Sequence, residues 1–168
     1  MRADLDRAAD VVRLATRFDW SWTLADLDRF CELTGWTVEE RGSRRVIMTT
    51  DLAIDRPESQ AYVDGERVRY ISIDVTDRLG KQEAATSPLP GMWFTQLCDR
   101  LRAHLYAPNQ RKDGRFRELR WDLPTVVVSV CGSARDCHVL LASPSYQAEQ
   151  DYIDEYIIAQ RDHDLDTP

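Results

Sequence analysis

Residues that commonly carry chemistry are scarce in this chain of 168 residues. Histidine occurs three times, as His104, His138 and His163, and there are only seven glycines. The glycines do not form the GxGxxG or P-loop spacing that cradles nucleotide phosphates. No serine stands in the GxSxG context of a hydrolase nucleophile. The sequence therefore carries no catalytic motif, and it predicts a protein that is not an enzyme and needs no cofactor.

Cysteine is also rare, and its spacing does not suit a metal site. The chain has four cysteines without a CxxC pair, so we expect no zinc or other metal. Cys131 and Cys137 flank a short turn segment and could face each other across a hairpin, although in a cytoplasmic protein we expect them to be reduced. A cysteine-dependent enzyme that works through Cys98, Cys131 or Cys137 stays open as an alternative hypothesis, and Cys98 or Cys137 could pair with a histidine.

The chain lacks long apolar runs. No stretch of about 18 apolar residues is present to cross a bilayer. The first twenty residues are charged throughout, unlike the apolar core of a signal peptide. We therefore expect a cytoplasmic protein that makes no membrane contact. The length suits a single domain over residues 1–168, large enough to fold without a metal or a disulfide.

Acidic residues are abundant, and they gather near the C-terminal end. The chain has 22 basic and 29 acidic residues, which gives a net charge of −7. Residues 149–168 alone contribute −6 of this charge, because they hold seven acids and one arginine. Tyrosines and isoleucines are interleaved with these acids. A surface that is both acidic and aromatic suits the binding of a basic protein.

Apolar periodicity and turn signals predict four helices and seven strands. Helices are expected at 4–18, between the N-cap Thr23 and Gly35, at 92–106 and at 146–160. Strands are expected at 36–41, 45–50, 60–63, 67–75, 116–121, 125–131 and 137–141. Residues 76–91 are predicted to form a long loop, and residues 162–168 a frayed acidic tail.

The order of these elements predicts the fold class. It is α-α-β-β-β-β-α-β-β-β-α, with the strands in two groups. This order indicates a single α+β domain, in which an antiparallel sheet has helices packed on one face. The five tryptophans stand at element boundaries or on apolar faces, so we expect them to be core anchors.

The last predicted helix holds the candidate binding surface. On a helical period Ile153, Tyr156 and Ile157 can face the core, which leaves the acids outside. The hypothesis is that a basic partner binds the outer face, for which the candidate residues are Asp151, Tyr152, Asp154, Glu155, Ile158 and Asp162. The alternative is a docked amphipathic helix whose acidic face is only solvated.

A basic stretch at residues 100–120 contrasts with this helix. It holds seven basic and two acidic residues. Contact with phosphate is one interpretation. The acidic chain as a whole would repel a nucleic acid, so we expect no nucleic-acid partner. The favoured interpretation is a solvated surface that partly pairs with the acidic helix.

Hydrophobic landmarks carry a resemblance over about residues 15–145. They are Phe18-Asp19-Trp20-Ser21-Trp22, then Thr34-Gly35-Trp36, and the strands 116–121 and 125–131. With these landmarks the chain resembles a family of small, uncharacterised actinobacterial proteins that look like toxin-immunity proteins. The element order is also similar to that of YbjN and type III secretion chaperone-like domains, with an added helix and extra strands. Neither family has a catalytic motif to transfer.

The acidic surface, the missing catalytic motifs and the resemblance lead to one expectation. The protein is expected to be a non-catalytic binding module, and most concretely an immunity protein that occludes the active site of a basic toxin. A secretion chaperone or adaptor for an effector is the first alternative. The chain is expected to be a monomer or a homodimer.

Overall fold

The computed structural model describes residues 1–165, and their side chains as far as residue 158. The helices are α1 Leu5–Arg17, α2 Leu24–Thr34, α3 Lys81–Ala84, α4 Leu89–Arg102 and α5 Pro144–Leu165. The strands are β1 Thr37–Arg41, β2 Arg45–Thr49, β3 Glu58–Asp64, β4 Arg67–Asp74, β5 Gln110–Lys112, β6 Arg117–Asp122, β7 Val127–Gly132 and β8 Cys137–Ala142. The expected α+β architecture is confirmed.

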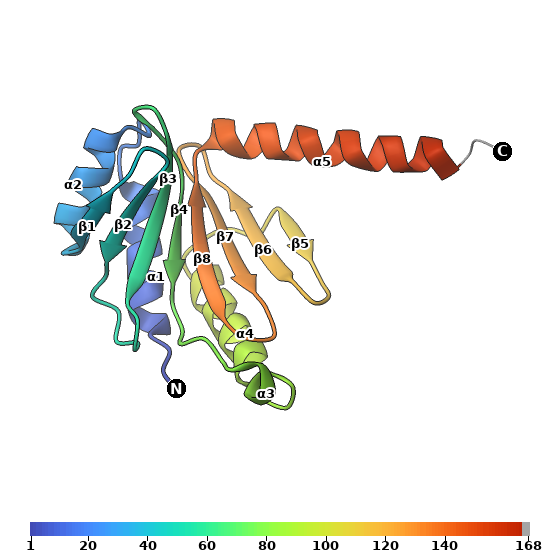
Figure 1. Cartoon of the computed structure of the whole chain (residues 1–168), viewed down its shortest axis with the longest axis horizontal. Coiled ribbons are helices and arrows are strands. Elements are labelled where there is room, and N and C mark those ends of the chain that lie inside the picture. Colours follow the sequence, from blue (N-terminus) through green and yellow to red (C-terminus); the bar gives the residue numbers. More distant parts are fainter. Residues whose placement is uncertain (166–168) are drawn as a thin grey trace.

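All eight strands belong to one antiparallel sheet with the order β1-β2-β3-β4-β8-β7-β6-β5 (Figure 1). Each half of the chain contributes a four-stranded meander. The last strands of the two meanders pair at the centre of the sheet, where Ser72 of β4 lies opposite Leu140 of β8. The first strand of each meander, β1 or β5, forms an outer edge.

The helices α1, α2 and α4 cover one face of the sheet, and the other face is open (Figure 1). Side chains alternate along each strand, so β6 directs Leu119 and Trp121 to the helices and Arg120 to the open face. Between the helices and the sheet lies a continuous apolar core that includes Val12, Phe30, Ile71, Leu97, Val130 and Leu141. The open face is therefore the surface on which polar strand residues gather.

The aromatic landmarks of the sequence form part of this core. Trp20 stacks on Trp22 with ring centroids 4.5 Å apart, and both are less than a tenth exposed. Trp22 has a positive φ of 58°, which is unusual for a bulky residue. Its indole Nε1 donates to the carbonyl of Thr125 at 2.8 Å, and its own carbonyl accepts from Val68. All five tryptophans are buried, as the sequence predicts.

Two segments differ from the sequence expectations. Residues 76–91, predicted to be a loop, contain α3 and the first residues of α4. The helix α4 begins at Leu89, three residues before the predicted start at residue 92. Pro90 is tolerated in its first turn, because the N–H that proline lacks would have no hydrogen-bond partner there. The strand β5 was missed because its three residues are polar and exposed. It pairs with β6 through Arg111 and Leu119.

The helix α5 begins at the end of the open face and projects beyond β5, away from the body of the protein (Figure 1). Ser143 caps it, since its hydroxyl accepts from the amide of Tyr146 at 3.2 Å. The predicted frayed tail 162–168 includes the last residues of this helix, while 166–168 lie outside the described residues. Within residues 1–165 no helix has both the length and the apolar character needed to cross a membrane.

Candidate functional site: a projecting helix and an open sheet face

A buried arginine of the open face anchors α5. Only 3% of the Arg120 side chain is exposed, and its two terminal nitrogens donate to the two carboxylate oxygens of Asp151 at 2.7 and 2.9 Å. Gln147, one turn earlier on α5, donates to the same carboxylate. Asp122 also holds the arginine: its Oδ2 accepts a hydrogen bond from Nη2 at 3.2 Å, and its Oδ1 lies 2.8 Å from Nε. The hydrogen bonds from Arg120, which outweigh the burial, lower the pKa of Asp151.

Aromatic stacking fixes the first turn of the same helix. Tyr62, Tyr70 and Tyr146 follow one another from β3 through β4 to α5, with ring centroids 4.7 and 5.2 Å apart. Arg69 lies over the ring of Tyr146 and also pairs with Glu149. Burial raises the pKa of Tyr70 to about 12, so its hydroxyl stays protonated. The base of α5 is thus held by rings and ion pairs.

The orientation of α5 differs from the one expected from the sequence. Residues four apart share a side of a helix, and the side that carries Asp151 faces the body, whereas residues 152–158 are all exposed. Asp151 binds Arg120, and the carboxylate of Asp154 lies 3.9 Å from the ammonium of Lys112 on β5. Arg120 and Lys112 belong to the basic stretch, so this stretch does pair with the acidic helix. The sequence predicts this pairing but not the individual partners, because these depend on which strands are neighbours.

The apolar side of α5 is turned toward solvent instead of the core. Tyr152 is 70% exposed, Ile153 46%, Tyr156 56% and Ile157 43%. The sequence expectation that Ile153, Tyr156 and Ile157 dock on the domain is therefore wrong. Ile158 is 58% exposed. We name the four residues Tyr152, Ile153, Tyr156 and Ile157 the α5 apolar side.

The six candidate residues thus have different environments. Tyr152, Glu155 and Ile158 are exposed, as the binding hypothesis requires. Asp151 is an internal anchor, and Asp154 is partly engaged by Lys112. Asp162 lies beyond residue 158, where the side chains are not described.

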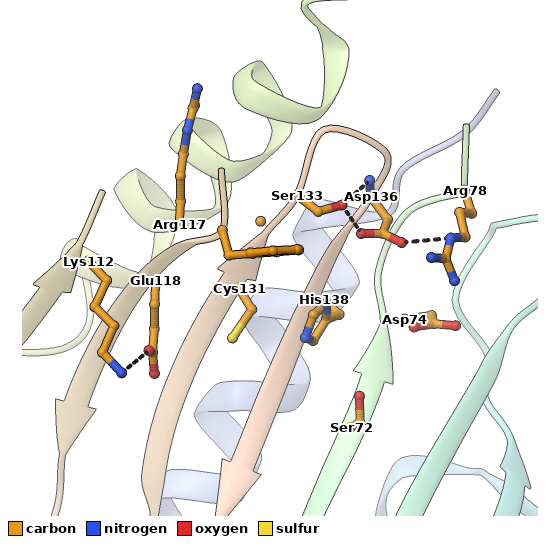
Figure 2. A pocket seen from close by; sticks show the side chains of 12 residues that line it. Ser72, Asp74, Arg78, Lys112, Arg117, Glu118, Cys131, Ser133, Asp136 and His138 are labelled. Atoms are coloured by element: carbon orange, nitrogen blue, oxygen red, sulfur yellow. Dashed lines mark hydrogen bonds and ion pairs between the residues drawn. The ribbon is translucent and has the colours of Figure 1, made fainter. Parts of the chain in front are cut away.

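Apart from α5, a cavity lies on the open face, at the end of the strands away from α5. This open-face cavity has a volume of about 550 Å³ (Figure 2). Strand register places five of its residues in one row across β4, β8, β7, β6 and β5, namely Asp74, His138, Cys131, Glu118 and Lys112. Sequence reasoning missed this row, because the pairing of β4 with β8 joins segments about sixty residues apart.

The row brings a thiol, an imidazole and a carboxylate together, but their protonation does not suit nucleophilic catalysis. Burial raises the pKa of the Cys131 thiol to about 12, and burial lowers the pKa of His138. Burial also raises the pKa of Asp74, although part of this residue is exposed where it lines the cavity. A reactive cysteine has a lowered pKa, because the thiolate is the nucleophile. Glu118 is already engaged by Lys112 at 3.3 Å and by the hydroxyl of Ser129.

The other cysteines of the enzyme hypothesis are less accessible. Cys98 and Cys137 are buried in the core, and burial raises the pKa of both thiols. Cys131 and Cys137 are both free thiols. They pair in register with His138 and Gly132 and therefore point to opposite faces of the sheet. Within the described residues, no group of three or more His, Cys, Asp or Glu side chains is placed to hold a metal ion.

The fold and these surfaces define a class: an α+β protein with an eight-stranded antiparallel sheet, helices on one face and a projecting C-terminal helix. Residues 6–143 match the family of unknown function DUF6301, and the chain belongs to this family. The match ends at Ser143, the cap of α5. No curated protein and no solved structure matches the chain.

Proposed function

We propose that the protein is a non-catalytic protein-binding module, and in concrete terms an immunity protein that covers the active site of a basic toxin. The observation that carries the proposal is the α5 apolar side, which a projecting helix presents to solvent. Exposed apolar patches on this scale are typical of interaction sites. Large aromatic and aliphatic anchors of this kind supply most of the binding energy at protein interfaces.

The size and position of α5 support a protein as the occupant. A helix of 22 residues extends about 33 Å at 1.5 Å per residue. A standard interface needs about 800 Å² from each partner. The anchored base of α5 keeps the projecting part oriented, which reduces the entropy lost on binding. The helix thus offers a preformed docking surface.

Charge complementarity supports a basic partner. Residues 144–158 hold four acids and no basic residue. Glu155 lies beside Tyr152 on the helix and is exposed. An acidic rim around an apolar centre accelerates the approach of a basic domain and disfavours acidic ones. Glu149 and Asp151 pair with Arg69 and Arg120 of the sheet, so Glu155 and the weakly engaged Asp154 supply this field.

The test is protection of growth against a toxin domain encoded by a neighbouring gene, which is first identified by expressing each neighbouring product and measuring its inhibition of growth. Cells that express that domain are expected to grow when the wild-type chain is co-expressed. The variant Tyr152→Ser/Ile157→Ser is expected to lose protection, because it removes two apolar anchors that face solvent. Its folded state should be as stable as the wild type. Leu33→Ser is the control, since Leu33 is a similarly exposed residue, 52%, on α2.

Several outcomes would contradict the proposal. Equal protection by the wild type and the double variant would remove α5 as the docking surface. A neighbouring gene whose product does not inhibit growth would remove the immunity role. Binding of the purified chain to an unfolded segment would indicate the chaperone alternative. Association of two copies through α5 would indicate a homodimer contact instead.

A further inference from the structure

Cations gather around one cavity, although the chain as a whole carries a net charge of −7. This cavity has a volume of about 420 Å³, and we name it the basic cavity. Four of its lining residues are cations. They are Arg78 after β4, Lys81 of α3, Arg115 of the β5–β6 hairpin and Arg135 of the β7–β8 hairpin. No carboxylate is among its lining residues.

Two of these cations are held by polar contacts, and within the described residues a carboxylate neutralises only one of the four. Nε of Arg135 donates to the carbonyl of Leu79 at 2.7 Å, and Nε of Arg78 lies 3.2 Å from Asp136. Figure 2 shows the Arg78–Asp136 pair at the edge of the neighbouring open-face cavity. Within residues 1–158, no carboxylate forms an ion pair with Lys81 or Arg115. The basic cavity therefore has an excess of positive charge.

An aromatic wall accompanies this charge. Phe116 lines the basic cavity and is 70% exposed, which is unusual for a phenylalanine. The guanidinium of Arg115 lies 5.6 Å from the centre of the ring. Three alanines also line the cavity: Ala84 at the end of α3, Ala85 directly after it and Ala134 of the β7–β8 hairpin. The lining thus combines an apolar wall with several cations.

We propose that the basic cavity binds a small phosphorylated aromatic compound, of which a nucleoside monophosphate is the simplest probe. Guanidinium groups match the oxygens of phosphate, and an ammonium adds a point charge. The exposed ring of Phe116 offers a stacking surface to a planar base. Pockets that hold small ligands have volumes of about 300–1,000 Å³, and the basic cavity lies in this range. All of its residues fall inside the range 6–143 that matches the family.

This site is separate from α5, so it does not depend on the proposed immunity function. The basic cavity is formed by residues 78–135, whereas the α5 apolar side begins at Tyr152. Loss of one function is therefore expected to leave the other intact.

The test is calorimetric titration of the whole chain with AMP, adenosine, inorganic phosphate and citrate. AMP is expected to bind more tightly than phosphate, and adenosine is expected not to bind. Lys81→Ala/Arg115→Ala is expected to weaken AMP binding at least about tenfold, because it removes two charged contacts to the phosphate. Arg44→Ala/Arg45→Ala is the matched control, because it removes the same charge from exposed residues near the other edge of the sheet.

A third variant tests the aromatic wall. Phe116→Ala is expected to weaken AMP binding about tenfold and to leave the affinity for inorganic phosphate unchanged. The proposal is overturned if AMP does not bind at millimolar concentration, or if adenosine or citrate binds as well as AMP. It is also overturned if the two double variants weaken AMP equally, which would indicate only general attraction of anions.

Discussion

Arg120 shows how a single side chain sets the geometry of a much larger surface. It lies on the open face, is nearly fully buried and is held by Asp151 of α5 and Asp122 of its own strand. A buried charge that loses its partner is costly. The pair therefore selects the orientation in which the Asp151 side of α5 faces the body. The apolar side is then turned to solvent as a consequence.

Asp151→Asn is expected to destabilise the protein by about 1–2 kcal/mol, measured by urea unfolding at pH 7. The cost stays below that of a fully buried pair because 36% of Asp151 is exposed and Asp122 remains bound to Arg120. Asp154→Asn is the control. Its carboxylate lies 3.9 Å from Lys112 and is exposed, so its loss is expected to cost less than about 0.5 kcal/mol. Equal effects of the two variants would show that Arg120 does not anchor α5.

The same pair predicts a dependence on pH. The pKa of Asp151 is lowered in the folded state, so the ionised carboxylate is favoured by folding. Its contribution is fully present above the unfolded pKa of about 3.9 and is lost as the pH falls through the folded pKa. The difference in stability between the wild type and Asp151→Asn is therefore expected to shrink below about pH 4. Unfolding curves between pH 7 and pH 3 would measure it.

At the scale of elements, the close contact between α4 and β7 requires a glycine, Gly132, on the strand. A Cβ placed on Gly132 would lie 2.8 Å from Cδ2 of Phe94, closer than real contacts allow. Gly132→Ala is therefore expected to destabilise the protein by about 1–3 kcal/mol, as overpacking does. Phe94→Leu in the same chain is expected to recover part of this loss, because it relieves the clash. Chemical denaturation measures both effects.

Gly80→Ala is the control for this prediction. Its Cβ would meet Glu83 at 3.5 Å, which is an ordinary contact. The variant is expected to be as stable as the wild type or slightly more stable. If Gly132→Ala proved equally harmless, α4 would have room to move away from the sheet.

Elements with local signals were predictable from the sequence. Thr23 caps α2 as expected, in a capping box with Asp26, and Gly35 ends that helix with a left-handed φ of 76°. The Asp64-Gly65 turn joins β3 and β4 as its sequence indicates. These features depend on a few adjacent residues. The α+β architecture could be predicted from the order of these elements, because two groups of strands with helices before and between them can pack in only a few ways.

Features that depend on distant neighbours were not predictable. The apolar period of α5 favours burial of Ile153 and Ile157, and only the position of Arg120 below the helix reverses this. The row that contains His138 and Cys131 likewise depends on which strands pair. A periodic pattern reports that a helix has two different sides, but it does not report what lies opposite each side.

At the scale of the whole molecule, net charge and the α5 apolar side act against each other. The charge of −7 keeps copies apart at neutral pH, whereas the exposed apolar residues favour association. The repulsion is expected to vanish near the isoelectric point of about 5.0. Light scattering is therefore expected to show growing self-association as the pH falls from 7 to 5. The variant Tyr152→Ser/Ile157→Ser is expected to suppress it, and equal association of both chains would assign it to another surface.

The two-meander sheet also has a consequence for the order of folding. Within each meander every strand pairs with its neighbour along the chain, so each ladder closes only a short loop. The central ladder is different, because it joins strands that are more than sixty residues apart in the sequence, from Tyr70–Ala142 to Asp74–His138. Closing a long loop costs more entropy and slows folding. The sheet is therefore expected to assemble from its two edges inward, with the β4–β8 seam as the late and rate-limiting step.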